Sequence, residues 1–221
     1  MSRPADPHAK IDLLRAAESV FVEHGLDNAR VEDITGRAGK SKGAFYLHFG
    51  SKEDAFRQIV ETLIARMASC LDDTPPLVDG VGTQAAVELL AAWRERDVEI
   101  FEFVWQNRGV MRLLLEGGKS AAFGYLIDEF AERSRVHTMR TLAWGVREGI
   151  FRADLDVELA SLVLSGAYDR VARDMVKRQR KPDLTKMFEQ MQRTLMYGLA
   201  SPAIREITDP LVKNPRSRRS R

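Results

Sequence analysis

The sequence is poor in cysteine and has no long apolar segment. Cys70 is the one cysteine among 221 residues, so an intramolecular disulfide framework is excluded and a reducing compartment is favoured. No run of about 18 apolar residues occurs, and we therefore expect no membrane-spanning helix. The polar, proline-containing start MSRPADPHAK also differs from a signal peptide. Together these absences predict a cytoplasmic protein that has no membrane partner.

The residue patterns of enzymes are missing as well. The sequence contains no set of nucleophile, base and acid, and no glycine-rich phosphate loop. The four histidines are scattered and lack the spacing of metal ligands; they are His8, His24, His48 and His137. We therefore expect a protein that is not an enzyme and that needs neither metal nor cofactor. For Cys70 an inert buried thiol is the expected state, with a redox sensor as the alternative.

Strand-like alternation, internal repeats and heptad seams are absent, whereas apolar residues recur at helical spacing along most of the chain. This pattern predicts an all-α fold, in which an N-terminal three-helix domain with a helix-turn-helix is joined to a C-terminal helical bundle. A linker is expected at 72–82, where prolines and glycines interrupt the pattern. The expected helices span about 10–24, 31–38, 41–49, 51–71, 83–106, 109–116, 119–148, 156–179 and 184–200.

The net positive charge is small, and the local excess of positive charge is concentrated in two places. The net charge is only +2, so the overall charge does not indicate a nucleic-acid binder. Residues 35–52, however, contain four Lys or Arg and no Asp or Glu, as expected of a surface that meets phosphates. Residues 201–221 contain six basic and two acidic side chains and are expected to be disordered. This tail either contacts DNA phosphates without sequence preference or is simply solvated.

Residues 31–52 form the most informative segment, because they match a helix-turn-helix. A short amphipathic helix leads to a turn at Gly39, and a second short helix follows. In that second helix Phe45 and Phe49 lie four residues apart and share one face, which can anchor the helix to a core. Lys42 and Tyr46 share another face, which is then left at the surface. Phe21 and Ile34 are expected to be buried with the two phenylalanines.

The run GKSKGAFYLHFGSKE at 39–53 resembles the DNA-binding signature of TetR-family repressors, and the similarity extends over about residues 10–65. The resemblance implies double-stranded DNA with a palindromic operator as the partner, a homodimer, and a small-molecule effector that remains unidentified. It also implies four segments. They are an arm and DNA-binding domain at 1–52, a connecting helix and linker at 53–82, a ligand-binding and dimerisation domain at 83–200, and the tail.

Three positions depart from the family pattern. The turn position after Gly39 is usually apolar and here is Lys40, and Gly36 occupies a mid-helix site where glycine costs about 0.5–1 kcal/mol relative to alanine. The residue that starts the helix of 31–38 is usually Thr or Ser and here is Arg30. Arg30 lacks a side-chain oxygen for capping, so a phosphate contact is the expected role.

The start of a recognition helix enters the major groove first, so its outward residues are the candidates for reading bases. The predicted base contacts are Lys42, Gly43, Ala44 and Leu47. The predicted phosphate contacts are Arg30, Ser41, Tyr46, His48 and Lys52. An ordinary exposed helix face is the alternative for the base-reading group, and a half-buried packing role is the alternative for His48.

Aromatic residues are frequent in the second half of the chain, where they either line an apolar ligand cavity or form plain core. The ligand-pocket candidates are Phe101, Trp105, Phe123, Trp144 and Tyr168. By resemblance, the helices at 156–179 and 184–200 form a two-fold dimer interface, although burial within one chain explains their apolar pattern equally well. The sequence therefore predicts a ligand-responsive repressor. The alternative is an architectural or adaptor protein whose helical domain binds another protein.

Overall fold

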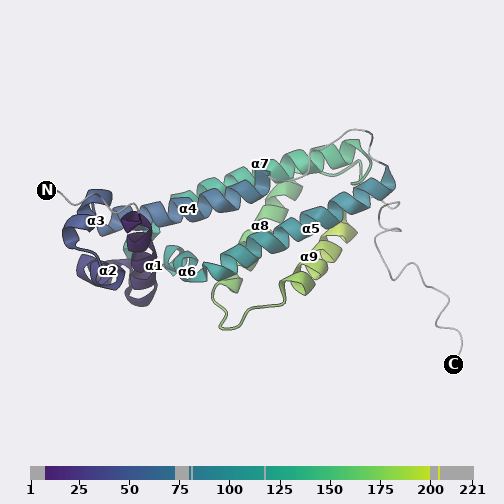
Figure 1. Cartoon of the computed structure of the whole chain (residues 1–221). Helices are drawn as coiled ribbons and strands as arrows, with labels where there is room; N and C mark the ends of the chain where they lie inside the picture. Colours follow the sequence, from purple (N-terminus) through teal and green to yellow (C-terminus); the bar gives the residue numbers. More distant parts are fainter. Residues whose placement is uncertain (1–7, 73–79, 81, 117, 200–203, 205–221) are drawn as a thin grey trace, which may run out of the picture. The chain divides into compact units, whose positions relative to one another are not determined.

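A computed structural model describes residues 8–72, 80, 82–116, 118–199 and 204 (Figure 1). Within these residues the chain forms helices and short connections, without a β-strand, so the predicted all-α class is confirmed. None of the described helices is both long and apolar enough to cross a membrane. Most of the predicted linker at 72–82 and all of the tail except Ile204 lie outside the described residues.

The described residues divide into two compact units. The first unit combines Met1–Met67 with Gln106–Phe130, and the second combines Ala68–Trp105 with Ala131–Arg221. The helices of the first unit are α1 (Ala9–Asn28), α2 (Val31–Ala38), α3 (Lys42–His48), most of α4 (Lys52–Asp72), α6 (Arg108–Glu116), the 3₁₀ helix η1 (Gly118–Phe123) and the start of α7 (Tyr125–Arg147). The second unit holds the rest of α4 and α7, with α5 (Thr83–Gln106), α8 (Val157–Met175) and α9 (Leu184–Leu199).

The core of the first unit is built on α1. The apolar face of this helix is buried, and the Phe21 ring meets Phe56 of α4 edge to face, with ring centroids 5.5 Å apart. Phe56 in turn meets Phe123 of η1 at 5.4 Å. Such edge-to-face contacts add about 0.5–1.5 kcal/mol each beyond the burial of apolar area. The aromatic chain therefore fixes α1, the platform on which α2 and α3 rest.

The end of α1 differs from the prediction. A helix ending at Gly25 was expected, but helical residues continue to Asn28, and Gly25 itself has non-helical angles of φ 75° and ψ 161°. Glycine reaches this positive φ without the steric penalty of a Cβ. The break therefore lies where expected, and one further turn follows it before Ala29 donates its N–H to the Gly25 carbonyl at 3.1 Å.

Two predicted helices in the second half of the chain were too long. The single helix expected at 119–148 is divided into η1 and α7, because Gly124 separates them and its carbonyl accepts the N–H groups of Ile127 and Asp128. The helix expected at 156–179 ends at Met175, where Val176, Lys177 and Arg178 make short turn hydrogen bonds. Neither end carries a proline, the strongest signal by which a sequence marks a helix end.

The second unit has its own core, and that core extends into the predicted tail. Trp144 is 1% exposed and Ile150 is 2% exposed, within a cluster drawn from α5, α7 and α8. Ile204, which the sequence assigns to the disordered tail, belongs to this cluster and is 4% exposed. The expectation of disorder was therefore wrong for Ile204. Residues 205–221 lie outside the described part of the chain.

Candidate nucleic-acid interface

The first helix of the motif begins without a side-chain cap. Arg30 occupies the N-cap of α2 in an extended conformation, with φ −116° and ψ 146°, and makes no capping hydrogen bond. Glu32 and Asp33 in the first turn offset this loss, because carboxylates are favourable near a helix N-terminus. Arg30 is exposed, so its guanidinium is available at the surface, as the predicted phosphate contact requires.

The turn between the two helices has a left-handed glycine at its centre. Gly39 has φ 64° and ψ 31°, and its N–H bonds to the Gly36 carbonyl at 3.2 Å. The following residue, Lys40, donates its backbone N–H to Thr35 at 2.9 Å and pairs its ammonium with Asp12 of α1 at 3.3 Å. Lys40, which departs from the family pattern, thus links the turn to α1.

The recognition helix α3 is fixed by one cap and one aromatic pair. Ser41 is its N-cap, and the hydroxyl oxygen accepts the Ala44 N–H at 3.1 Å, which satisfies one of the free amides of the first turn. Phe45 and Phe49 are fully buried, with ring centroids 5.1 Å apart. Burial of Phe45, Phe49, Phe21 and Ile34 confirms the predicted core.

The opposite face of α3 is open to solvent. Leu47 is 78% exposed and Tyr46 is 57% exposed, and Lys42 and Gly43 are exposed beside them. Ala44 and His48 are half-buried. All predicted base-contact residues therefore lie on one short helix, and three of the four are exposed. Their contacts with bases remain a prediction.

Gly43 has no structural reason to be glycine within the chain. A Cβ built at this position would meet only the Ser41 hydroxyl oxygen, at an ordinary contact distance of 3.7 Å, and its φ is not positive. Glycine in a helix costs about 1 kcal/mol relative to alanine. The fold therefore tolerates glycine at this position but does not require it.

Lys42 forms an ion pair with an acidic residue that the sequence analysis did not name as a candidate. Its ammonium forms an ion pair with the Glu32 carboxylate of α2, and both side chains are 57% exposed. The hydrogen bond to Lys42 lowers the pKa of Glu32, and the same bond raises the pKa of Lys42. Glu32 lies outside the segment 35–52 whose charge was counted, and ten residues separate the pair in sequence, so only the folded turn brings them together.

Lys52 has a structural role besides its predicted contact with phosphate. Its ammonium donates to the backbone carbonyls of Asp27 at 2.9 Å and Ala29 at 2.8 Å, so it ties the start of α4 to the end of α1. An ammonium has three N–H donors, which leaves one for a phosphate. The sequence offered no signal for this link, because the two carbonyls lie more than 20 residues away, with separations of 25 and 23.

The start of α4 is capped within the chain. The Ser51 hydroxyl oxygen accepts the Asp54 N–H at 3.1 Å, and the Asp54 carboxylate accepts the Gly50 N–H at 3.0 Å. The Gly50 N–H, followed by Arg57, lowers the pKa of Asp54. Because Asp54 carries negative charge at this point, the predicted phosphate contact would depend on Lys52 more than on the helix amides.

The five aromatic ligand candidates are distributed over separate contacts. Phe101 and Tyr168 meet in the second unit at 6.1 Å between ring centroids, together with Phe188. Trp144 meets Trp93 at 6.2 Å. Trp105 is buried, and Phe123 belongs to the first unit through its contact with Phe56. The structure thus brings Phe101 and Tyr168 together and assigns Phe123 to another unit.

Tyr168 anchors a polar contact inside the aromatic group. Its hydroxyl donates to the Asp97 carboxylate at 2.5 Å, and Arg96 pairs with the other oxygen of Asp97 at 2.9 Å. Burial, followed by the charge of Asp97, raises the pKa of Tyr168 well above its usual value. Burial likewise lowers the pKa of His137, which lies 3.3 Å from Arg96. Sequence analysis missed Asp97, which its pattern does not distinguish from a surface carboxylate.

The short capped helix with an exposed face on a buried aromatic pair defines the class of fold: the chain carries a helix-turn-helix. Residues 13–59 match the family model of bacterial regulatory proteins of the tetR family. The chain is 30% identical over 153 residues to the transcriptional repressor KstR2 of Mycobacterium tuberculosis, which covers 67% of this chain and 72% of that protein. The chain belongs to the TetR family. It is a DNA-binding transcriptional regulator, and its relatives are regulators rather than enzymes.

Solved structures agree on the fold. SmeT, the repressor of the SmeDEF multidrug efflux pump of Stenotrophomonas maltophilia, superimposes with a TM-score of 0.69 at 21% identity, covering 88% of this chain and 92% of SmeT. A complex of SmeT with triclosan gives a TM-score of 0.71 at the same identity and covers 89% and 93% of the two chains. At such identities the similarity concerns the fold alone.

Proposed function

We propose that the protein is a dimeric repressor that binds a palindromic operator through α3 and is released from it by a small-molecule ligand. The observation that carries the DNA-binding part is the exposed face of α3, held outward by Phe45 and Phe49. A cation, a glycine without an internal role and an exposed leucine suit guanine acceptors, close approach and thymine methyl groups respectively. The repressor names of the relatives favour repression over activation.

A second face of the chain supports the dimer. Leu159, Leu162 and Val163 of α8 are 58%, 51% and 58% exposed, and they follow one another at helical spacing. Gly166, one turn further, has nothing within 4 Å of a Cβ built upon it. A stripe of exposed aliphatic side chains next to a glycine suits close packing against the same helix of a second copy. Two-fold symmetry would then present two α3 helices to successive major grooves.

The ligand response rests on the second unit and on a relative. Phe101, Tyr168 and Phe188 form a buried aromatic group next to the Asp97 carboxylate. Such a combination of apolar rings and one polar anchor is typical of sites for small, largely apolar molecules. One solved structure of SmeT is a complex with triclosan. We infer that the effector of this chain is a small molecule with a large apolar part.

The decisive experiment is selection of bound genomic fragments with the purified full-length protein, followed by footprinting of enriched sites. A repressor should protect a discrete site with dyad symmetry, whose half-sites lie about 34–36 Å apart or a multiple of that distance. Lys42→Ala should then relax the base preference at one position of each half-site by about tenfold. Sequence-indifferent protection would instead favour the architectural alternative, in which the second unit binds a protein.

A further inference from the structure

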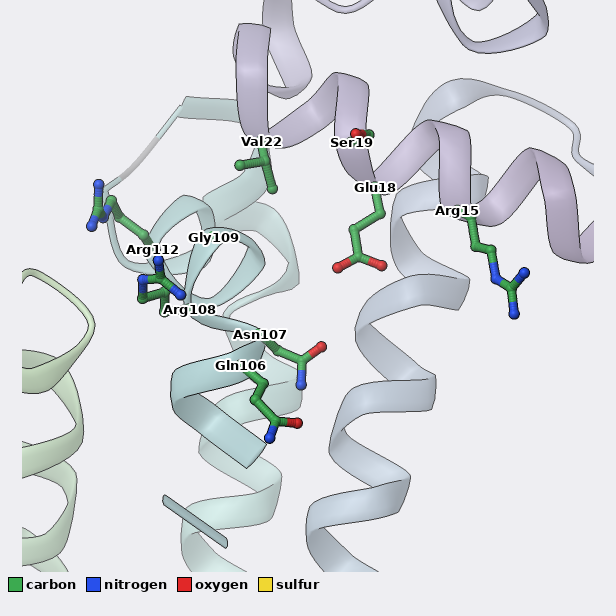
Figure 2. A pocket seen from close by; sticks show the side chains of 9 residues that line it. All are labelled: Arg15, Glu18, Ser19, Val22, Gln106, Asn107, Arg108, Gly109 and Arg112. Carbon is green, nitrogen blue, oxygen red and sulfur yellow. The ribbon is translucent and has the colours of Figure 1, made fainter. Parts of the chain in front are cut away.

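The first unit contains a pocket that neither the DNA-binding surface nor the aromatic group uses. It has a volume of about 450 Å³ and lies between α1, the last residue of α5 and the start of α6 (Figure 2). Pockets of about 300–1,000 Å³ are the usual size of small-molecule sites. The lining side chains are Arg15, Glu18, Ser19, Val22, Gln106, Asn107, Arg108, Gly109 and Arg112.

The lining is polar and unevenly charged. The lining contains three guanidinium groups, one carboxylate, a serine hydroxyl and two amides. In Figure 2 Arg15 lies on the side of Glu18 away from Arg108 and Arg112. Gly109 closes one end, since a Cβ at this position would lie 2.8 Å from a Val22 methyl group. At this point α6 and α1 are therefore in direct contact beside the pocket.

Glu18 is the unusual member of this set. Its carboxylate is half-buried, and within the described residues it has no hydrogen bond and no ion pair, not even with Arg15 one turn earlier on α1. Burial raises the pKa of Glu18, whereas a guanidinium in contact would lower it. Figure 2 shows the carboxylate directed from α1 into the pocket. A half-buried carboxylate of this kind suits a cationic donor supplied from outside.

The α6 side of the pocket has the opposite character. Arg108 and Gly109 belong to the first turn of α6, a helix of nine residues, so backbone N–H groups and the positive end of the helix face this side. Arg112 follows one turn later on the same helix and adds a second guanidinium. Guanidinium groups at a helix N-terminus are a favourable setting for carboxylates.

We propose that this pocket binds a dicarboxylic amino acid, with its ammonium at Glu18 and its carboxylates at Arg108 and Arg112. The charges match, because the ligand carries one positive and two negative groups against the Glu18 carboxylate and the two guanidiniums of α6. A simple anion would leave Glu18 without a partner and would be repelled by it. A simple amine would offer no carboxylate to the two guanidiniums of α6. An amphoteric ligand satisfies both sides of the pocket.

The test is a calorimetric titration of the full-length protein with L-glutamate and with L-aspartate, in the absence of DNA. Two analogues separate the two ends of the ligand. Glutarate lacks the ammonium, and 4-aminobutyrate lacks one carboxylate. We expect saturable binding of at least one of the two amino acids, and binding of both analogues that is weaker by about tenfold or more, as loss of a charged hydrogen bond requires.

Variants assign the contacts. Glu18→Gln keeps the shape of the side chain, and we expect it to weaken amino-acid binding by about tenfold while leaving glutarate binding unchanged or tighter. Arg112→Gln should weaken the amino acids and glutarate alike. Glu129→Gln, an exposed carboxylate of the same unit outside the pocket, is the matched control and should change nothing. Circular dichroism and thermal melting establish that each variant is folded.

Three results would overturn the proposal. They are absence of saturable binding for both amino acids, equal affinity for glutamate and glutarate, and a Glu18→Gln variant that binds glutamate as tightly as the wild type. The second result would define a plain anion site. Because no DNA is present in these titrations, their outcome is independent of whether the operator proposal holds.

Discussion

Lys42 of the recognition helix is held by Glu32 of the preceding helix through an ion pair across the turn. The cation predicted to read a base is therefore occupied in the free protein by a carboxylate of the same motif. If Lys42 contacts DNA, DNA and Glu32 compete for one ammonium group, and binding requires this exposed pair to open.

The first prediction follows from this competition. Glu32→Gln should tighten DNA binding by roughly two- to tenfold at low salt, because it frees Lys42 and removes a negative charge close to phosphates. Fluorescence anisotropy at several salt concentrations measures the effect. Glu61→Gln is the control, since Glu61 pairs with Arg57 on α4 in another exposed contact, at 2.6 Å. Weaker binding in Glu32→Gln would mean that Glu32 orients Lys42 for DNA.

Lys52 should affect stability and DNA binding together. Lys52→Met keeps the aliphatic stem but removes the hydrogen bonds to the carbonyls of Asp27 and Ala29, so we expect a loss of about 1–3 kcal/mol in the free energy of unfolding. If Lys52 also contacts a phosphate, binding should weaken equally for all DNA sequences. Denaturant unfolding and anisotropy measure the two effects, with Lys10→Met on exposed α1 surface as the control. Unchanged stability would contradict the link between α1 and α4.

Gly43→Ala should separate folding from function. The fold leaves room for the added methyl group, so the variant should be more stable by up to about 1 kcal/mol. DNA affinity should nevertheless fall by about tenfold or more, because the methyl group would lie between α3 and the base edges. Gly36→Ala, where the fold also leaves room, should show the same gain in stability and serves as the control. Undiminished DNA affinity would place this face of α3 outside the groove.

The exposed stripe of α8 predicts the assembly state. Leu162→Glu should convert a dimer into a monomer, because it places a charge in the centre of the proposed interface. The residue is 51% exposed, so the folded chain itself should lose little stability. Sedimentation velocity distinguishes the two states. Leu47→Glu, which is 78% exposed on α3, is the matched control and should remain dimeric. A Leu162→Glu protein that stays dimeric would exclude α8 as the interface.

Ile204 allows a test of where the second unit ends. Ile204→Ala should lower the free energy of unfolding by about 2–5 kcal/mol, as removal of a buried aliphatic side chain does. A chain shortened to end at residue 204 should keep the wild-type melting temperature, whereas one ending at residue 202 should melt earlier. Equal melting of the two shortened chains would show that Ile204 adds nothing to the core.

Local signals made the motif predictable from the sequence. The turn at Gly39 and the spacing of Phe45 and Phe49 each depend on a few neighbouring residues, and both were found as expected. Ser41, predicted as a phosphate contact, caps α3. Apolar periodicity likewise placed most helices to within a few residues. These features depend on helix geometry and backbone sterics, which a short stretch of sequence specifies.

Long-range pairings were not predictable in this way. The contact of Glu32 with Lys42, the bonds of Lys52 to distant carbonyls and the position of Glu18 beside α6 depend on tertiary placement, which hydrophobic periodicity does not encode. The five aromatic candidates were grouped because they share a residue type, yet Phe123 packs in the first unit. Residue type thus indicated which residues pack in a core, but it did not show to which of the two units each residue belongs.

The close approach at Gly109 has a consequence for how this sequence can change. A methyl group at 109 would overlap the methyl groups of Val22 at 2.8 and 2.9 Å, so the two positions share one fixed volume. Enlarging residue 109 is acceptable only together with a reduction at residue 22. Gly109→Ala should therefore destabilise the protein. Adding Val22→Ala should restore stability, although the two positions lie far apart in the chain. In related sequences we expect the sizes of these two residues to vary inversely, as a pair under joint selection.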